Sequence, residues 1–143
     1  MNDIHALIYV STIVDGVDDA EISRIVEQAQ RKNAAVDVTG LLVRCGDLFM
    51  QAIEGEADRV ESLYARIATD PRHGNVRRVA TTDLGERFFA KWSMGFEQVG
   101  THRLEEHTAE HASTLLAPLL KAGHLEHDIV KRAMLERLPA NRS

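Results

Sequence analysis

The stretch VDVTGLLVRCGDLFMQAIEG, residues 36–55, decides the fold. It predicts two strands, Val36–Arg44 and Leu48–Glu54, because both segments are rich in apolar and β-branched residues. The residues between them, Cys45 to Asp47, predict a three-residue hairpin loop that contains a glycine. The two strands are therefore expected to pair antiparallel, with Cys45 in the turn.

Amphipathic helices are predicted on both sides of this hairpin, over Asp19–Lys32 and Glu56–Thr69. In each segment apolar residues recur at i, i+3, i+4 and i+7, which places them on one face of a helix. Pro71 ends the second helix, because proline cannot continue the hydrogen-bond ladder. The apolar positions are Ile22, Ile25, Val26 and Ala29 in the first helix and Val60, Leu63, Tyr64 and Ile67 in the second.

Three further strands are predicted, over His5–Ser11, Val76–Thr82 and Phe88–Phe96. The first is a nearly continuous apolar run, which is typical of a central strand covered on both faces. The resulting order is β-α-β-β-α-β plus a fifth strand. The fold class is accordingly α/β, in the α+β sense, with a ferredoxin-like arrangement.

The chain is expected to form one domain over residues 1–99, with residues 100–143 as a C-terminal helical extension of that domain. After Gly100 the strand signals end, and two helices are predicted with a break near Gly123. Pro118 is expected to kink or restart the first of them. The second helix carries an apolar stripe that should pack on the open face of the sheet: Leu125, Ile129, Ala133, Met134 and Leu138.

Composition narrows the classes of partner. With 22 acidic and 17 basic residues the formal net charge is −5, and there is no basic stripe, so nucleic acid is not an expected partner. No apolar run approaches the ~18 residues of a membrane span, and the amino terminus lacks a basic leader segment. A soluble, cytoplasmic protein is expected. The single cysteine, Cys45, excludes an internal disulfide and a multi-cysteine metal site.

Three polar residues are placed where they could converge between the helices and the sheet. Strand alternation puts the Gln51 amide on the same face as Phe49 and Ile53, so it needs polar partners in an apolar layer. Tyr9 lies in the first strand, and Asn33 ends the first helix. Taken singly, each residue also fits an ordinary role: a core tyrosine, a helix C-terminal residue and a satisfied strand amide.

Five motifs in order make the pattern more specific: LIYVS, N-x5-TGLL, F-x-Q-x2-EG, L-x2-RI-x2-DPRH and RFFAKWSMGF. In sequence and spacing, residues 6–96 resemble the BLUF family of blue-light sensors. The resemblance implies FAD as cofactor, with its ring between the two helices and its polar edge facing Asn33 and Gln51. Two side-chain amides suit that edge, because it both accepts and donates hydrogen bonds.

The same resemblance implies a photoreceptor rather than an enzyme. Tyr9 would give an electron and a proton to the excited flavin, and the Tyr9–Gln51–flavin hydrogen bonds would return rearranged. Trp92 and Met94, expected on one face of the last strand, would pass the change on. The output would be self-association or contact with an unidentified downstream protein, and the apolar stripes favour a homo-oligomer.

The remaining cofactor-binding candidates follow from the resemblance as well. Ile25, Ala29, Leu42 and Phe49 would form apolar walls around the ring. Arg72 and His73, with Lys32, would lie near the ribityl or phosphate part, and FMN or riboflavin could occupy the same site. Arg66 and Asp70 match the family motif, although surface salt bridges explain them equally well.

Two other hypotheses remain. His107, Glu110 and His111 spell H-x-x-E-H, a zinc-hydrolase pattern, but a catalytic site needs a third protein ligand and only 32 residues follow His111. No metal site is therefore predicted. A ferredoxin-like module without photochemistry, which binds another ligand or only oligomerises, is also compatible with the fold.

Overall fold

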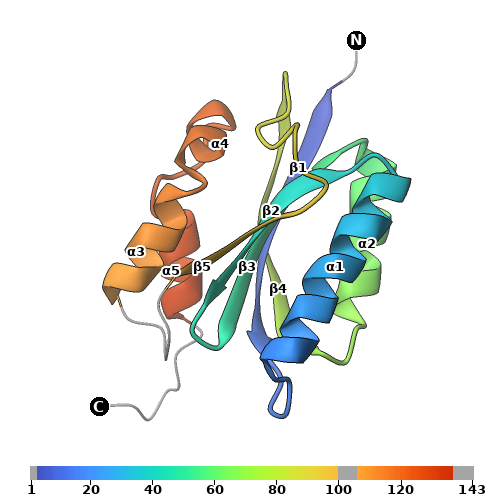
Figure 1. The fold of residues 1–143 in the computed structure, drawn as a ribbon. Helices are drawn as coiled ribbons and strands as arrows, with labels where there is room; N and C mark the ends of the chain where they lie inside the picture. Colours follow the sequence, from blue (N-terminus) through green and yellow to red (C-terminus); the bar gives the residue numbers. More distant parts are fainter. Residues whose placement is uncertain (1–2, 100–105, 137–143) are drawn as a thin grey trace.

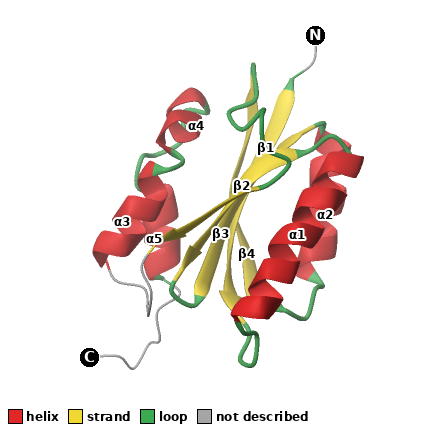
Figure 2. Ribbon diagram, viewed as in Figure 1, coloured by secondary structure: helices red, strands yellow, loops and turns green. Residues whose placement is uncertain are grey.

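The computed structural model describes residues 3–99 and 106–136, the side chains of residues 106–108 excepted. One mixed five-stranded sheet, with strand order β4-β1-β3-β2-β5, lies between two groups of helices (Figures 1 and 2). The ferredoxin-like order predicted from the sequence is confirmed. The strands are β1 Ile4–Ile13, β2 Thr39–Cys45, β3 Leu48–Gly55, β4 His73–Leu84 and β5 Gly95–Val99.

Helices α1 (Asp19–Ala35) and α2 (Ala57–Ala68) cover one face of the sheet. Each begins where a carboxylate accepts a free backbone N–H: Asp18 accepts from the amide of Glu21, and Glu56 accepts at the start of α2. Helix α1 continues to Ala35, so Asn33 lies within its last turn instead of ending it. Their apolar stripes face the sheet as predicted, because Ile22, Ile25, Val60 and Leu63 are buried there.

The β2–β3 hairpin is antiparallel as predicted, but its turn is shorter. Cys45 is the last residue of β2, where it is buried and pairs with Leu48. The prediction that Cys45 is a turn residue is therefore wrong. Only Gly46 and Asp47 form the turn, and Gly46 has the positive φ of 64° that glycine adopts without strain.

The predicted strand Phe88–Phe96 is the largest error of the sequence analysis. The structure places β5 at Gly95–Val99, parallel to β2, and residues 88–94 form a loop. The backbone N–H groups of Phe88 and Phe89 donate to the Glu54 carboxylate instead of to a strand. The expected shared face of Trp92 and Met94 is consequently wrong as well.

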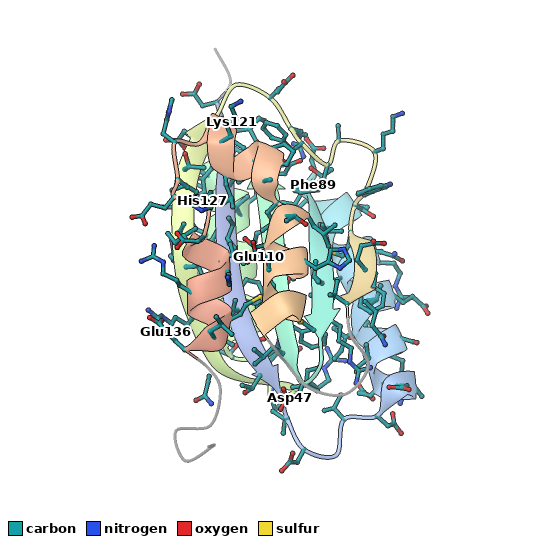
Figure 3. All side chains as sticks on the ribbon, turned by 90° about the vertical axis from the view of Figure 1, so that its left-hand side faces the viewer. Asp47, Phe89, Glu110, Lys121, His127 and Glu136 are labelled. Atoms are coloured by element: carbon teal, nitrogen blue, oxygen red, sulfur yellow. The ribbon has the colours of Figure 1, made fainter. Side chains whose placement is uncertain are left out.

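The other face of the sheet is covered by helices from the C-terminal segment (Figure 3). Among the described residues these are α3 (Glu106–Thr114), α4 (Ala117–Ala122) and α5 (Ile129–Leu135), one more than predicted. Pro118 lies in the first turn of α4, so it restarts the helix. Ala133 and Met134 pack into the core beneath the sheet as expected, whereas Leu138 lies outside the described residues.

The sheet thus separates two hydrophobic cores. One core lies under α3–α5 and contains Ile8, Val43 and Met50. The other lies under α1 and α2 and contains Tyr9 and Leu42, so polar groups on this second face lie between the helices and the sheet. No helix in the described part of the chain is long and apolar enough to cross a membrane.

Candidate functional site

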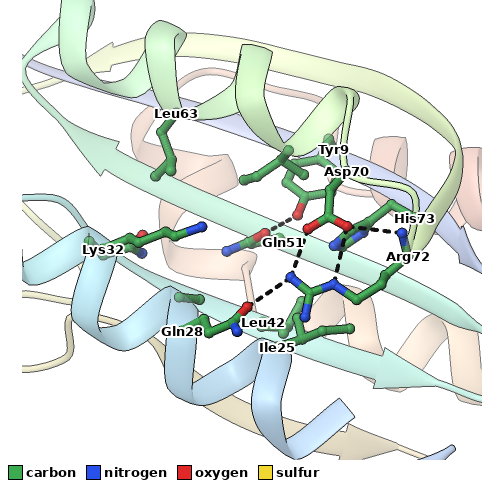
Figure 4. Close-up of a pocket in the computed structure, with 13 residues that line it drawn as sticks. Tyr9, Ile25, Gln28, Lys32, Leu42, Gln51, Leu63, Asp70, Arg72 and His73 are labelled. Atoms are coloured by element: carbon green, nitrogen blue, oxygen red, sulfur yellow. Dashed lines mark hydrogen bonds and ion pairs between the residues drawn. The ribbon is translucent and has the colours of Figure 1, made fainter. Parts of the chain in front are cut away.

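A pocket opens between α1, α2 and the sheet, and the three polar residues singled out from the sequence converge in it (Figure 4). Tyr9 comes from β1, Gln51 from β3 and Asn33 from the last turn of α1. The predicted convergence is therefore present in the structure. The remaining lining residues are Ile25, Gln28, Ala29, Lys32, Leu42, Leu63, Ile67, Asp70, Arg72 and His73.

Tyr9, Gln51 and Met94 form a continuous hydrogen-bonded series, which begins at Tyr9 and Gln51 in the pocket lining and ends at Met94, which does not line the pocket. The antiparallel register places Tyr9 directly opposite Gln51, and the Tyr9 hydroxyl donates to Gln51 Oε1. The amide Nε2 of Gln51 then donates to the Met94 sulfur over 3.2 Å. All three side chains are buried. The Gln51 amide is the only polar group between the tyrosine and the loop in this series, so any reorientation of it changes both contacts.

Burial raises the pKa of the Tyr9 hydroxyl above its usual value, and the nearby Tyr64 and Asp70 add to the shift. Tyr9 is therefore neutral at physiological pH, and its hydroxyl donates a hydrogen bond to Gln51 Oε1.

Asn33 attaches α1 to the loop that precedes β5. Its buried side chain donates from Nδ2 to the Ser93 carbonyl oxygen over 2.8 Å. One turn earlier, Gln30 donates from Nε2 to the Met94 carbonyl oxygen over 3.1 Å. The C-terminal part of α1 thus holds both Ser93 and Met94, and Gln51 contacts Met94 as well.

Charged residues close the opposite end of the pocket. Arg72 contacts Asp70 at 2.8 Å, Glu21 at 3.0 Å and the Gln28 amide oxygen at 2.9 Å, so it joins the start of β4 to α1. These bonds to Arg72 lower the pKa of Asp70 to about 2, against an opposing effect of burial. Lys32 lines the same pocket, and no carboxylate among the described residues pairs with it. Lys32 lies on the other side of Gln51 from Arg72, so it gives the pocket a cationic group apart from the Arg72 ion pairs (Figure 4).

His73 lies on the inner side of this charged group. Its Nδ1 is 3.1 Å from the Ser11 hydroxyl, and its ring packs against Tyr9 and Phe49 at centroid distances of 6.3 and 5.3 Å. Burial lowers the pKa of His73, so the neutral ring is favoured at physiological pH. His73 therefore contributes a hydrogen-bonding group, and the cationic side chain at this end is Arg72.

Not every candidate residue lines the pocket. Phe49 is buried behind His73, and Arg66 is exposed on α2 away from the cavity. Trp92 is 51% exposed and lines a different cavity, next to α3 and α4. Sequence reasoning missed Gln28, although its spacing from Ile25 and Lys32 placed it on the same face of α1.

The H-x-x-E-H segment lies in α3, on the opposite side of the sheet from this pocket. Glu110 there forms a 2.6 Å ion pair with Lys131, and the described residues contain no cluster of three metal-binding side chains. The side chain of His107 lies outside the description.

Sequence comparison identifies the family. The model of "BLUF: Sensors of blue-light using FAD" matches residues 4–95. The photoactivated adenylate cyclase subunit beta of Euglena gracilis is 37% identical over 89 residues, 62% of this chain and 10% of that protein. The blue light- and temperature-regulated antirepressor BluF of Escherichia coli K12 is 34% identical over 100 residues, 70% of this chain and 25% of BluF. The chain thus spans a quarter or less of these relatives.

Solved structures agree with the family match. The photo-activated state of BlsA has a TM-score of 0.69 and 27% identity, and the likeness covers 98% of both chains. A bacterial light-regulated adenylyl cyclase has a TM-score of 0.67 and 29% identity, over 85% of this chain and 35% of the cyclase. The dark state of the BLUF protein BlrB shares the fold, with a TM-score of 0.68. The chain belongs to the BLUF family, the blue-light sensors that use a flavin.

Proposed function

We propose that this blue-light photoreceptor binds FAD between α1 and α2 and senses light through Tyr9, Gln51 and Met94. The observation that carries the proposal is the continuous series from the Tyr9 hydroxyl through the Gln51 amide to the Met94 sulfur. When bound, the flavin supplies blue-light absorption and an acceptor for an electron and a proton. The chain supplies the donor, Tyr9, and the amide whose hydrogen bonds can be exchanged, Gln51.

The lining of the pocket supports a flavin. Ile25, Ala29 and Leu42 provide apolar walls, while Asn33 and Gln51 provide amides that can both donate and accept hydrogen bonds. The edge of a flavin ring carries both hydrogen-bond acceptors and a donor. These can pair with the two side-chain amides, so no charged residue is needed at that edge. The cavity in this arrangement has a volume of about 60 Å³, so the side chains that cross it, Arg72 first, must shift to admit the ring.

The charges at the pocket entrance favour a phosphate-bearing flavin over riboflavin. Lys32 and Arg72 can neutralise phosphate oxygens, and arginine binds them in a bidentate manner. FMN and FAD both meet this requirement, and the BlrP1 protein of Klebsiella pneumoniae has been solved with FMN. We assign FAD because the family model describes that cofactor.

The output is proposed to be a change in contacts with a second copy or with another protein. Met94 connects the proposed switch to a loop whose Trp92 is 51% exposed. A light-induced change there alters the affinity of the surface for a partner, because an output without turnover requires different affinities in the two states.

The deciding experiment is the absorption spectrum of the purified protein before and after blue illumination, followed by recovery in the dark. We expect a flavin spectrum with a small, reversible red shift in the wild type. Gln51→Leu should retain flavin, because the apolar walls remain, and should lose the shift. Arg66→Ala is the matched control, because this exposed side chain does not line the pocket and should leave both flavin and shift unchanged.

A normal red shift in Gln51→Leu would refute the role of the amide. A wild-type protein that cannot be reconstituted with FAD or FMN would instead favour the interaction module without photochemistry.

A further inference from the structure

The loop formed by residues 88–94 contacts both hydrophobic cores. Phe89 is buried in the core under α3–α5, whereas Met94 is buried in the core under α1 and α2. Between them the Trp92 carbonyl accepts a hydrogen bond from the amide of Gly40, at the start of β2. The loop therefore passes from one face of the sheet to the other beside β2.

One end of this loop is held by a buried carboxylate that the proposed light reaction does not involve. Glu54 is fully buried and lies three residues after Gln51 on β3, so it points to the opposite face. Its two carboxylate oxygens accept from the backbone N–H groups of Phe88 and Phe89, each over 2.8 Å. Thr39 donates a third hydrogen bond from Oγ1 over 2.7 Å.

The other end of the loop is held only by neutral groups. Asn33 and Gln30 donate to the carbonyl oxygens of Ser93 and Met94, and Gln51 donates to the Met94 sulfur. Hydrogen bonds to an ionised carboxylate are roughly twice as strong as bonds between neutral groups, and sulfur is a weak acceptor. The Phe88–Phe89 end is thus held by a carboxylate. At the other end the backbone is held by α1 and by the start of β5, and only the Met94 side chain depends on the amide that switches.

We propose that Glu54 is a positioning residue of the light response, which holds the Phe88–Phe89 end in place while the Met94 side chain moves. This inference rests on the proposed function. When Gln51 exchanges its hydrogen bonds, the Met94 side chain loses its partner and moves, and the fixed Phe88–Phe89 end directs this change to Trp92, which lies between them in the loop. Without the Glu54 carboxylate the Phe88–Phe89 end would move as well. The change at Met94 would then not be directed to Trp92.

The structure shows what such a movement reshapes. Phe88, Phe89 and Trp92 form one wall of a cavity of about 360 Å³, and Leu115, Pro118 and Leu119 form the wall opposite. In the first wall, Phe88 and Phe89 are therefore anchored to Glu54. Trp92 is followed two residues later by Met94, which contacts Gln51. A shift of the Trp92 side chain relative to the anchored Phe88 and Phe89 changes the cavity next to α3 and α4 without unfolding either helix.

Trp92 is the only tryptophan of the chain, so its fluorescence reports on this wall directly. We would compare wild type, Glu54→Gln and the control Thr39→Val as flavin-loaded proteins. The three measurements are the flavin red shift, the light-induced change in Trp92 emission and amide hydrogen exchange at Phe88 and Phe89. Glu54→Gln keeps the size of the side chain but replaces one accepting oxygen with an NH₂ group. Thr39→Val removes one hydrogen bond to Glu54, together with the bond from Arg87 to the same hydroxyl, and leaves both loop bonds intact.

In Glu54→Gln we expect a wild-type red shift, exchange that is about tenfold faster in the dark at one of the two amides, and loss of the light-induced Trp92 change. Thr39→Val should retain all three wild-type properties. If Glu54→Gln does not fold, Glu54→Asp, which is shorter by one methylene and cannot reach both amides, should show the same loss.

A wild-type Trp92 response in a folded Glu54 variant overturns the inference, and so does an equal loss in Thr39→Val. Absence of the red shift in the wild-type protein instead overturns the proposed function, and this inference with it.

Discussion

The bond between Tyr9 and Gln51 can be tested by a double-mutant cycle. Tyr9→Phe removes the hydroxyl and leaves Gln51 Oε1 buried without its donor. Gln51→Leu leaves the Tyr9 hydroxyl buried without its acceptor. Each single substitution strands one buried polar atom, which costs about 1–3 kcal/mol of the free energy of unfolding. The double variant Tyr9→Phe/Gln51→Leu removes both atoms at once, so neither penalty remains.

The expected result is strong non-additivity. The loss in the double variant should be smaller than the sum of the two single losses by about 2–6 kcal/mol, because two penalties of about 1–3 kcal/mol are both absent. The assay is urea unfolding of the flavin-free proteins, because bound flavin would add a stabilisation of its own. Losses that add within about 0.5 kcal/mol would refute the reasoning, since residues that do not share a hydrogen bond behave in that way.

Two further predictions follow from the surroundings of the pocket. Because the pKa of Asp70 is held at about 2 by Arg72, the wild type should lose about 1–2 kcal/mol of stability as the pH falls from about 4 to 2, since the carboxylate favours folding only above its folded pKa. Denaturant unfolding at a series of pH values measures this loss. The prediction is contradicted if the free energy of unfolding of Asp70→Asn falls as steeply with pH as that of the wild type over that range. Gly40→Ala should destabilise the protein by about 1–3 kcal/mol, because the new Cβ would lie 2.2 Å from the Ala52 carbonyl oxygen. Thermal unfolding tests this against the control Gly85→Ala, whose new Cβ would have no neighbouring atom within 4 Å. Equal losses of stability in the two variants would contradict the prediction.

The loop before β5 shows why local pattern was insufficient there. Residues 88–96 are rich in aromatic residues, which favours a strand. Their amides instead meet Glu54, which is more than 30 residues earlier in the chain and buried on the opposite sheet face from Gln51. A local pattern contains no information about such a partner, so neither the position of β5 nor the exposure of Trp92 could be derived from it.

The charged residues of the pocket also show what could be predicted from the sequence and what required the structure. The sequence singled out Asp70, Arg72 and His73 through the DPRH motif, and Lys32 in the first predicted helix. The structure brings all four residues to the pocket. Sequence reasoning could not separate cofactor binding from salt bridging, and the position of Arg72 in the structure is compatible with both. It lines the cavity, and it also bridges Asp70 to Glu21 on α1.

The sequence by itself determined the elements whose signals are periodic or local: both amphipathic helices, the β2–β3 hairpin, the apolar first strand and, through its motifs, the family. These follow from the spacing of apolar residues, which reflects burial on one face of a helix or strand. Only the tertiary structure decided the end of α1, the position of β5, the separate environments of Trp92 and Met94, and the contact of Glu54 with the Phe88 and Phe89 amides. The physical reason is that a buried polar group takes whichever partner the packed chain brings to it, and that partner can lie anywhere in the sequence.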